Sequence, residues 1–268
     1  MWTLEDDIEL ITGVFSNFFS VFNLPSKLFE YTFNSLIDRV EKGFKGGIDS
    51  IPPFTPKHEI AVKMRENINV FSGAKTFQNV KDLSNFVFLP DGSKRPFKEF
   101  KEMALKINAE YNINWLKTEQ DAAFMRSISA EKWQEIQAQK DILPLLKWNT
   151  VGDARVRDEH KALEGIIKPV DDKFWDTYYP PIDWGCRCDV DQLDEGEVTN
   201  LEEHLKEYNK NLDKPLEFLP KPIPLFSDNP GKSHLIFLED TAKKHPYFKV
   251  EQKYKVIQND NNFQLGYL

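Results

Sequence analysis

Apolar residues recur at helical spacing over about forty residues in the middle of the chain, and this pattern constrains the fold more than any other feature. The pattern begins after Pro96 and continues through "WLKTEQDAAFMRSISAEKWQEI" to Ile136. Its first turns place one apolar face on Phe100, Met103, Ala104, Ile107 and Tyr111. Residues three and four apart share one side of a helix, so we predict a long helix from near Pro96 to about Ile136. Residues 51–148 are therefore expected to form a mostly helical region.

Residues 1–50 are also predicted to be helical, with Pro25 separating two helices. Aromatic residues form a stripe at helical spacing, made up of Phe15, Phe18, Phe19, Phe22, Phe29 and Phe33. Two interpretations stay open for this stripe. The aromatic residues pack against the rest of the protein, or they form docking helices for a larger assembly. A linker is expected from Lys45 to Pro56.

Charge and hydropathy exclude several classes of protein. The apolar run from Ile11 to Leu24 is interrupted and too short to span a bilayer, and acidic residues precede it, so we expect a cytoplasmic chain without membrane attachment. The formal net charge is −8, which argues against a strongly electrostatic nucleic-acid binder. Two small basic groups keep a DNA-contacting alternative open: Lys94, Arg95, Lys98 and Lys101, and Lys243 with Lys244. "SGAKTF" lacks the glycine spacing of a phosphate loop.

The segment 149–195 mixes strand and helix signals. We predict a short strand at its start, a turn at Gly152, and a helix that is capped by Asp153 and ends near Gly165. An irregular loop rich in proline and aromatic residues follows, and it returns to a strand at "CRCDV". For residues 196–268 we expect a charged helix from about Asn200 and then an extended Pro-rich tail. The predicted fold class is α+β, with a helical N-terminal half and a small α+β domain.

The chain has only two cysteines, Cys186 and Cys188, and they are separated by one residue. A disulfide between them would be strained, and the cytosol would keep it reduced. A nucleophilic cysteine would need an oxyanion arrangement, which nothing nearby resembles. In an extended segment both sulfurs face the same side, so they can bind one metal ion. His160, on the preceding helix, is the natural third ligand for zinc.

A fourth ligand is harder to assign, because none of the nearby acidic residues stands out. The candidates are Asp183, Asp153 and Asp158. Three ligands and a water molecule would instead leave an open site. Chemistry alone leaves a second interpretation equally open, in which both cysteines are buried thiols under the aromatic loop and His160 bonds to the backbone.

The same segment carries a pattern of fixed spacings over about forty residues. Its elements are Asp153, Arg155, His160, Leu163, Gly165, Pro180, Pro181, Cys186, Arg187 and Cys188. This pattern resembles the signature of the phage Mu protein F-like family of minor head, or head-morphogenesis, proteins. The helical block before it also resembles members from Bacteroidetes-type phages or prophages. The likeness therefore covers roughly residues 57–193 and, more loosely, the tail.

The resemblance implies a structural, non-enzymatic protein of the virion head, assembled in the cytoplasm of the bacterial host. It implies the portal protein and the major capsid protein as partners, with packaged DNA as a further contact. Some relatives carry Cys at the position of Arg157 and His near Asp183, and their residues resemble a complete four-ligand zinc site. This chain keeps His160, Cys186 and Cys188, so the resemblance favours one structural zinc ion that clips the helix to the returning strand.

Two alternatives stay open beside this interpretation. One is a zinc-dependent hydrolase in which Asp153 or Asp158 acts as the general base. The other is a nuclease-like or toxin-like effector whose catalytic set lies in the tail, at Lys232, His234, Glu239 and His245. The tail is short for a catalytic domain, which weighs against the second alternative.

Overall fold

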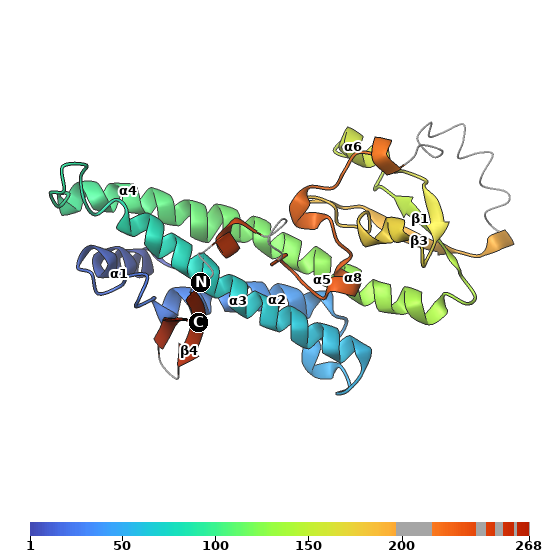
Figure 1. The fold of residues 1–268 in the computed structure, drawn as a ribbon, viewed down its shortest axis with the longest axis horizontal. Helices are drawn as coiled ribbons and strands as arrows, with labels where there is room; N and C mark the ends of the chain where they lie inside the picture. Colours follow the sequence, from blue (N-terminus) through green and yellow to red (C-terminus); the bar gives the residue numbers. More distant parts are fainter. Residues whose placement is uncertain (197–215, 240–244, 250–253, 260–261, 268) are drawn as a thin grey trace. The chain divides into compact units, whose positions relative to one another are not determined.

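In the computed structural model, which describes residues 1–196, 216–239, 245–249, 254–259 and 262–267, helices dominate the first half of the chain (Figure 1). These elements are α1 (Leu4–Phe15), α2 (Ser26–Gly43), the 3-10 helix η1 (Ile48–Ser50), α3 (Pro56–Ser84), α4 (Phe97–Ala109), the π-helical segment η2 (Glu110–Trp115) and α5 (Leu116–Gln139). The predicted helical N-terminal half is confirmed, and with the small sheet described below the fold is α+β.

The chain divides into two units, and each combines segments that are far apart in the sequence. Unit 1 consists of Met1–Arg39, Arg65–Asp121 and Lys244–Leu268, whereas unit 2 consists of Val40–Met64 and Ala122–Lys243. The division into four consecutive segments stays a prediction.

The aromatic stripe near the N-terminus contributes mainly to the core of unit 1. Phe29 is buried, while the rings of Phe15, Phe19 and Phe33 pack against the core at its edge. The expected continuation of the first helix beyond residue 15 is wrong, because α1 ends at Phe15 and the chain turns before α2. This turn leaves two members of the stripe, Phe18 and Phe22, about two-thirds exposed, at 66% and 65%.

The long helix that was predicted from near Pro96 is confirmed, but its middle is π-helical. The π-helical segment η2 directs Tyr111 and Asn112 into the interior of unit 1. The Tyr111 hydroxyl donates a hydrogen bond of 2.5 Å to the Asp82 carboxylate on α3.

A buried ion pair joins two helices of unit 1. The Lys75 ammonium on α3 contacts the Glu119 carboxylate on α5, and both side chains are almost fully buried. Burial lowers the pKa of Lys75 and raises the pKa of Glu119. Tyr247, in the 3-10 helix η6 (Pro246–Lys249), donates its hydroxyl to Glu119. "SGAKTF" thus lies inside α3 and holds a structural lysine.

Next to this ion pair lies a histidine whose protonation opposes folding. His245 packs edge-on against Phe71 and its ring centroid lies 4.6 Å from that of Tyr247. Burial, followed by the charge of Lys75, lowers the pKa of His245 to about 3. The folded protein therefore holds this imidazole neutral at pH values where an exposed histidine would be charged.

Replacing His245 with phenylalanine is expected to reduce the loss of stability in mild acid. The unfolded chain binds a proton at this histidine below a pH of about 6.5, whereas the folded chain binds it only near pH 3, so stability falls as the pH falls between these values. Urea unfolding should show that the free energy of unfolding decreases between pH 7 and pH 5. This decrease should be about 2 kcal/mol larger for the parent protein than for His245→Phe. Equal losses would contradict this assignment.

Unit 2 contains a three-stranded antiparallel sheet with the order β2-β1-β3. Its strands are β1 (Leu145–Asn149), β2 (Ile167–Pro169) and β3 (Asp189–Leu193). The central strand β1 pairs with both neighbours, with Lys147 opposite Ile167 on one side and Asp191 on the other. Two strands form where the sequence predicted them, but β1 already ends at Asn149 and β3 begins only at Asp189, so the expected strand at "CRCDV" does not include the cysteines. The loop predicted after Gly165 is less irregular than expected, because β2 and the 3-10 helix η3 (Lys173–Asp176) form within it.

Aromatic side chains of this loop fill the core of unit 2. Trp148 and Trp175 are fully buried, and the indole N–H of each donates to a backbone carbonyl, that of Tyr178 at 2.8 Å and that of Pro169 at 2.9 Å. The ring of Tyr178 stacks on that of Phe174, with centroids 4.7 Å apart. Buried tryptophan needs a partner for its N–H, and here the loop backbone provides it.

The tail is anchored by side chains in both units. In unit 2, the buried Arg126 guanidinium on α5 donates to the Asp228 carboxylate at 2.7 and 2.8 Å and to the Leu235 carbonyl. Short helices lie along this part: η4 (Leu216–Phe218), η5 (Pro224–Phe226) and α8 (Pro230–Ser233). In unit 1, β4 (Tyr254–Asn259) pairs with β5 (Asn262–Tyr267). This hairpin was not predicted; the charged helix expected from Asn200 lies outside the described residues.

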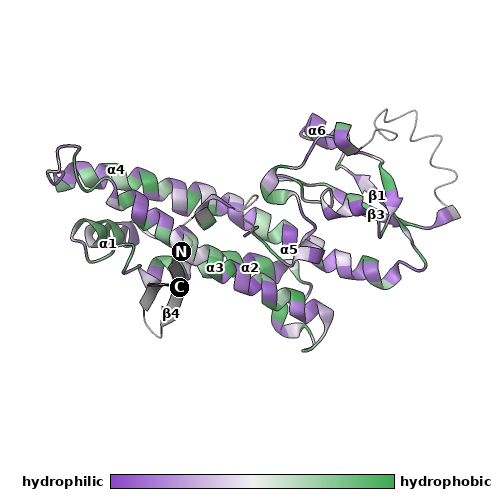
Figure 2. Cartoon of the chain, in the orientation of Figure 1, coloured by the Kyte–Doolittle hydropathy of each residue, from purple (hydrophilic) through white to green (hydrophobic). Residues whose placement is uncertain are grey.

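Polar and apolar residues alternate along the helices, as Figure 2 shows. None of the helices in the described part of the chain is both long enough and apolar enough to cross a membrane. This agrees with the interrupted apolar run at Ile11–Leu24, where α1 ends.

Candidate metal centre

His160 is positioned by a short helix of unit 2, α6 (Asp158–Lys161), which follows the turn after β1. The predicted helix start at Asp153 is wrong, because α6 begins five residues later and Arg157 precedes it as the N-cap residue. Gly152 has φ +70° and Asp153 accepts the Arg155 N–H, so both belong to the preceding turn. The His160 side chain is 5% exposed and points into the unit.

Cys186 and Cys188 come immediately before β3 and are both buried and reduced. Gly185 has φ +63°, a conformation that residues with a side chain rarely adopt, and the Cys186 N–H donates to the Asp183 carbonyl at 3.2 Å. This turn tightens the chain ahead of the strand. Pairing of Val190 with Trp148 then fixes the strand beside β1.

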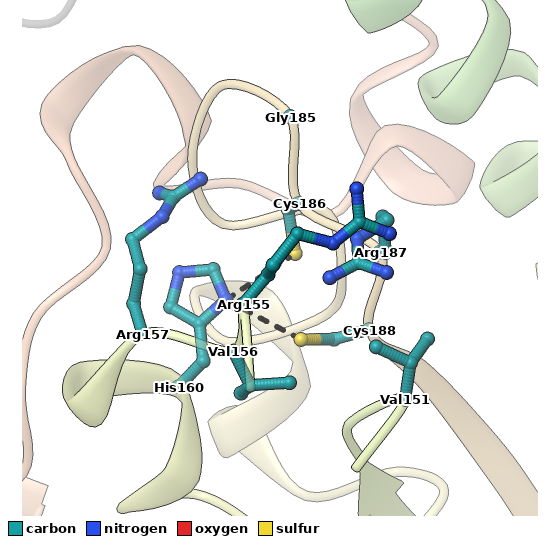
Figure 3. Close-up of a pocket in the computed structure, with 9 residues that line it drawn as sticks. All are labelled: Val151, Arg155, Val156, Arg157, His160, Gly185, Cys186, Arg187 and Cys188. Atoms are coloured by element: carbon teal, nitrogen blue, oxygen red, sulfur yellow. Dashed lines mark hydrogen bonds between the residues drawn. The ribbon is translucent and has the colours of Figure 1, made fainter. Parts of the chain in front are cut away.

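The imidazole and the two sulfurs converge on one point (Figure 3). His160 Nδ1 lies 3.3 Å from Cys188 Sγ and 3.7 Å from Cys186 Sγ. All three ligand atoms lie within 4.8 Å of one another. Zinc bonds of roughly 2.0–2.3 Å in a tetrahedron put such atoms about 3.5 Å apart, so the donor set and the spacing both fit zinc.

The pKa values of the two thiols are shifted in opposite directions. A hydrogen bond from Cys188, supported by His160, lowers the pKa of Cys186 to about 5. The same hydrogen bond and burial raise the pKa of Cys188. One thiolate, stabilised by its neighbours, is the form that binds a metal cation first.

The acidic residues predicted as a fourth ligand bind to basic side chains. Asp183 pairs with Arg157 and also accepts the Trp184 N–H at 2.7 Å. Asp153 accepts two hydrogen bonds from Arg187, at 2.7 and 2.8 Å, which hold the pKa of its carboxyl well below the usual range. Asp158 is highly exposed and contacts Lys161 at 3.2 Å. Within the described ranges, the metal-ligating cluster thus contains only the histidine and the two cysteines.

The remaining signature residues build the frame of this centre. Leu163 is fully buried in the core of unit 2. Gly165 has φ +78°, and its N–H donates to the Trp148 carbonyl at 2.8 Å, which carries the chain from α6 back to the sheet. Pro180 and Pro181 are joined by a cis peptide bond. The Asp153–Arg187 pair links the turn after β1 to the cysteine segment.

The tail residues of the effector alternative are divided between the two units. Lys232 bonds to Asp176 at 2.5 Å within unit 2, whereas His245 is buried against Phe71 within unit 1. Glu239 and His234 belong to unit 2, like Lys232. Among the basic groups, Lys94 lies over the Phe15 ring at 4.1 Å and Arg95 pairs with Glu99. Lys243 and Lys244 lie outside the described residues.

Sequence comparison shows which proteins this part of the chain is similar to. Residues 98–191 match the family model described as Phage Mu protein F like protein, and this range contains most of the long helix and of the sheet and all three candidate ligands. This similarity agrees with the resemblance seen in the signature.

Two curated proteins are similar to part of the chain. The Mu-like prophage FluMu F protein of Haemophilus influenzae is 39% identical over 80 residues, and the Putative capsid assembly protein F of Escherichia phage Mu is 35% identical over 72 residues. These matches cover 30% and 27% of this chain but only 18% and 16% of the two relatives. No solved structure matches this chain.

Proposed function

We propose that this chain is a structural minor head protein of a tailed phage and takes part in head assembly, contacting the portal protein and the major capsid protein. The observation that carries the proposal is the similarity over residues 98–191 to a family with a member named as a capsid assembly protein. The proposed location is the virion head, with assembly in the host cytoplasm. Packaged DNA is a further proposed contact.

We propose that His160, Cys186 and Cys188 hold one structural zinc ion. Bound zinc would tie α6 to the segment before β3 and contribute folding free energy. The chain itself prepares the site, since the turn at Gly185 aims both sulfurs at the imidazole. A structural role fits the burial of all three side chains. The protein is therefore proposed not to be an enzyme.

Binding to the portal protein should depend on the exposed aromatic residues of unit 1. Phe18 and Phe22 lie in the turn after α1 and are not needed for the core, so Phe18→Ser with Phe22→Ser should leave the thermal unfolding temperature unchanged. We expect the double variant to co-purify with the portal protein of the same phage less well than the parent. Exposed large apolar side chains are common anchors of protein interfaces.

A matched control replaces Ile142, which is 77% exposed in unit 2, with serine. Co-purification that is unaffected by the Phe18 and Phe22 substitutions would contradict docking through this turn. Failure of the parent protein to bind the portal protein or the capsid protein would contradict the proposed function itself.

A further inference from the structure

The candidate metal centre opens into a small pocket whose rim carries three arginines. The three metal-ligating residues line the pocket together with Arg155, Arg157 and Arg187 (Figure 3). A tetrahedral ion held by one nitrogen and two sulfurs keeps one position for a further ligand. All three donor residues line the pocket, so an external ligand that reached an ion held there would enter through it.

Nearby acidic side chains do not fill this position in the structure. Asp183 is held by Arg157, and both oxygens of Asp153 accept hydrogen bonds from Arg187. Moving either carboxylate to the metal would break an ion pair and leave its arginine without that partner. An external ligand avoids this cost.

The guanidinium groups around the pocket favour an anion as that ligand. Zinc with two thiolates would be neutral overall, and the rim adds three guanidinium groups beside the carboxylates of Asp153 and Asp183 and that of Glu164, whose charge acts on Cys188. Arg155 is the least committed of the three, because its side chain is 79% exposed and its contact with Asp153 is 3.5 Å. A guanidinium at this place can orient an oxygen ligand by a charged hydrogen bond.

We propose that the fourth position of this metal centre takes a carboxylate from outside the chain, which displaces a bound water molecule and is oriented by Arg155. This inference rests on the metal centre proposed above. The shared chemistry is that of a free carboxylate such as acetate and that of an acidic side chain on a partner protein. In the head, the second source would let a neighbouring chain complete the centre.

The test uses the full chain loaded with cobalt(II) in place of zinc, because tetrahedral cobalt has visible absorption bands that respond to each ligand. Titration with acetate, and separately with a capped Gly-Glu-Gly peptide, should shift these bands to saturation. A response to acetate alone would assign the position to small free carboxylates. A response to both would show that an acidic side chain of a partner protein can also bind there. Chloride at equal ionic strength controls for salt.

Three variants separate the outcomes. Arg155→Gln should weaken carboxylate binding about two- to fivefold without changing the starting spectrum, while Lys161→Gln, which is not on the rim, should change neither. Asp183→Asn should keep the parent spectrum and its response. A starting spectrum altered by Asp183→Asn, or tetrahedral bands that ignore both carboxylates, would overturn this inference alone. Failure to bind cobalt or zinc would overturn the metal centre as well.

Discussion

Replacing Lys75 with methionine is expected to lower the free energy of unfolding by about 3–5 kcal/mol, among the largest effects of any single substitution in unit 1. The substitution removes the partner of Glu119, which is 3% exposed and would be left as an unpaired charge among apolar neighbours. The variant would then fold with Glu119 protonated, since burial already raises the pKa of this carboxyl. The free-energy cost of protonating it grows with pH. Urea unfolding at pH 7 measures the loss.

A second substitution tests whether the unpaired charge causes the loss. Adding Glu119→Gln to Lys75→Met removes the charge and keeps an acceptor for the Tyr247 hydroxyl, so most of the stability should return. The matched control is Lys63→Met, which breaks the exposed pair with Glu59 and should change stability by less than about 1 kcal/mol. A loss for Lys75→Met no larger than for this control would contradict the buried pair.

Replacing His160 with alanine is expected to remove the zinc-linked part of the stability of unit 2. The parent protein should contain about one zinc ion per chain by elemental mass spectrometry, and a chelator should lower its thermal unfolding temperature strongly. The variant should contain little zinc and respond weakly to the chelator. The expected loss amounts to several kcal/mol, because the ion binds the folded chain far better than the unfolded one.

The control for this experiment is Asp158→Asn, which changes an exposed residue of the same short helix without touching the three ligands. It should keep the zinc content and the response to the chelator. A parent protein without zinc, whose unfolding temperature is the same with and without chelator, would contradict the proposed centre. Cys186, Cys188 and His160 would then be core residues of unit 2.

Features that depend on local sequence could be predicted well. The helix that runs from Phe97 to Gln139 follows from apolar spacing, which each turn expresses by itself. The π-helical segment within it could not be predicted, because it depends on Tyr111 reaching Asp82 on another helix. The three candidate ligands could be named because two cysteines separated by one residue can share a metal ion with a histidine on the preceding helix, and the structure brings the three side chains together.

Features that depend on distant partners were missed. Asp153 has the chemistry of a helix cap, but its carboxylate is held by Arg187, which lies 34 residues later in the chain. Strand β2 has only three residues, and their extended form depends on pairing with β1 rather than on their own preference. Likewise, Asp183 is a plausible zinc ligand until its contact with Arg157 is known.

The position of Tyr247 has a consequence for the order of events during synthesis. Unit 1 draws on both the first and the last parts of this sequence, and Tyr247 contacts a glutamate that is made more than a hundred residues earlier. While the ribosome still holds residue 247, Lys75 and Glu119 lack that neighbour and stay closer to water. The last segment of unit 2 precedes the last segment of unit 1 in the sequence, so it is synthesised first. The costly desolvation of the two charges is thus completed last, when the elements that enclose them have already been made.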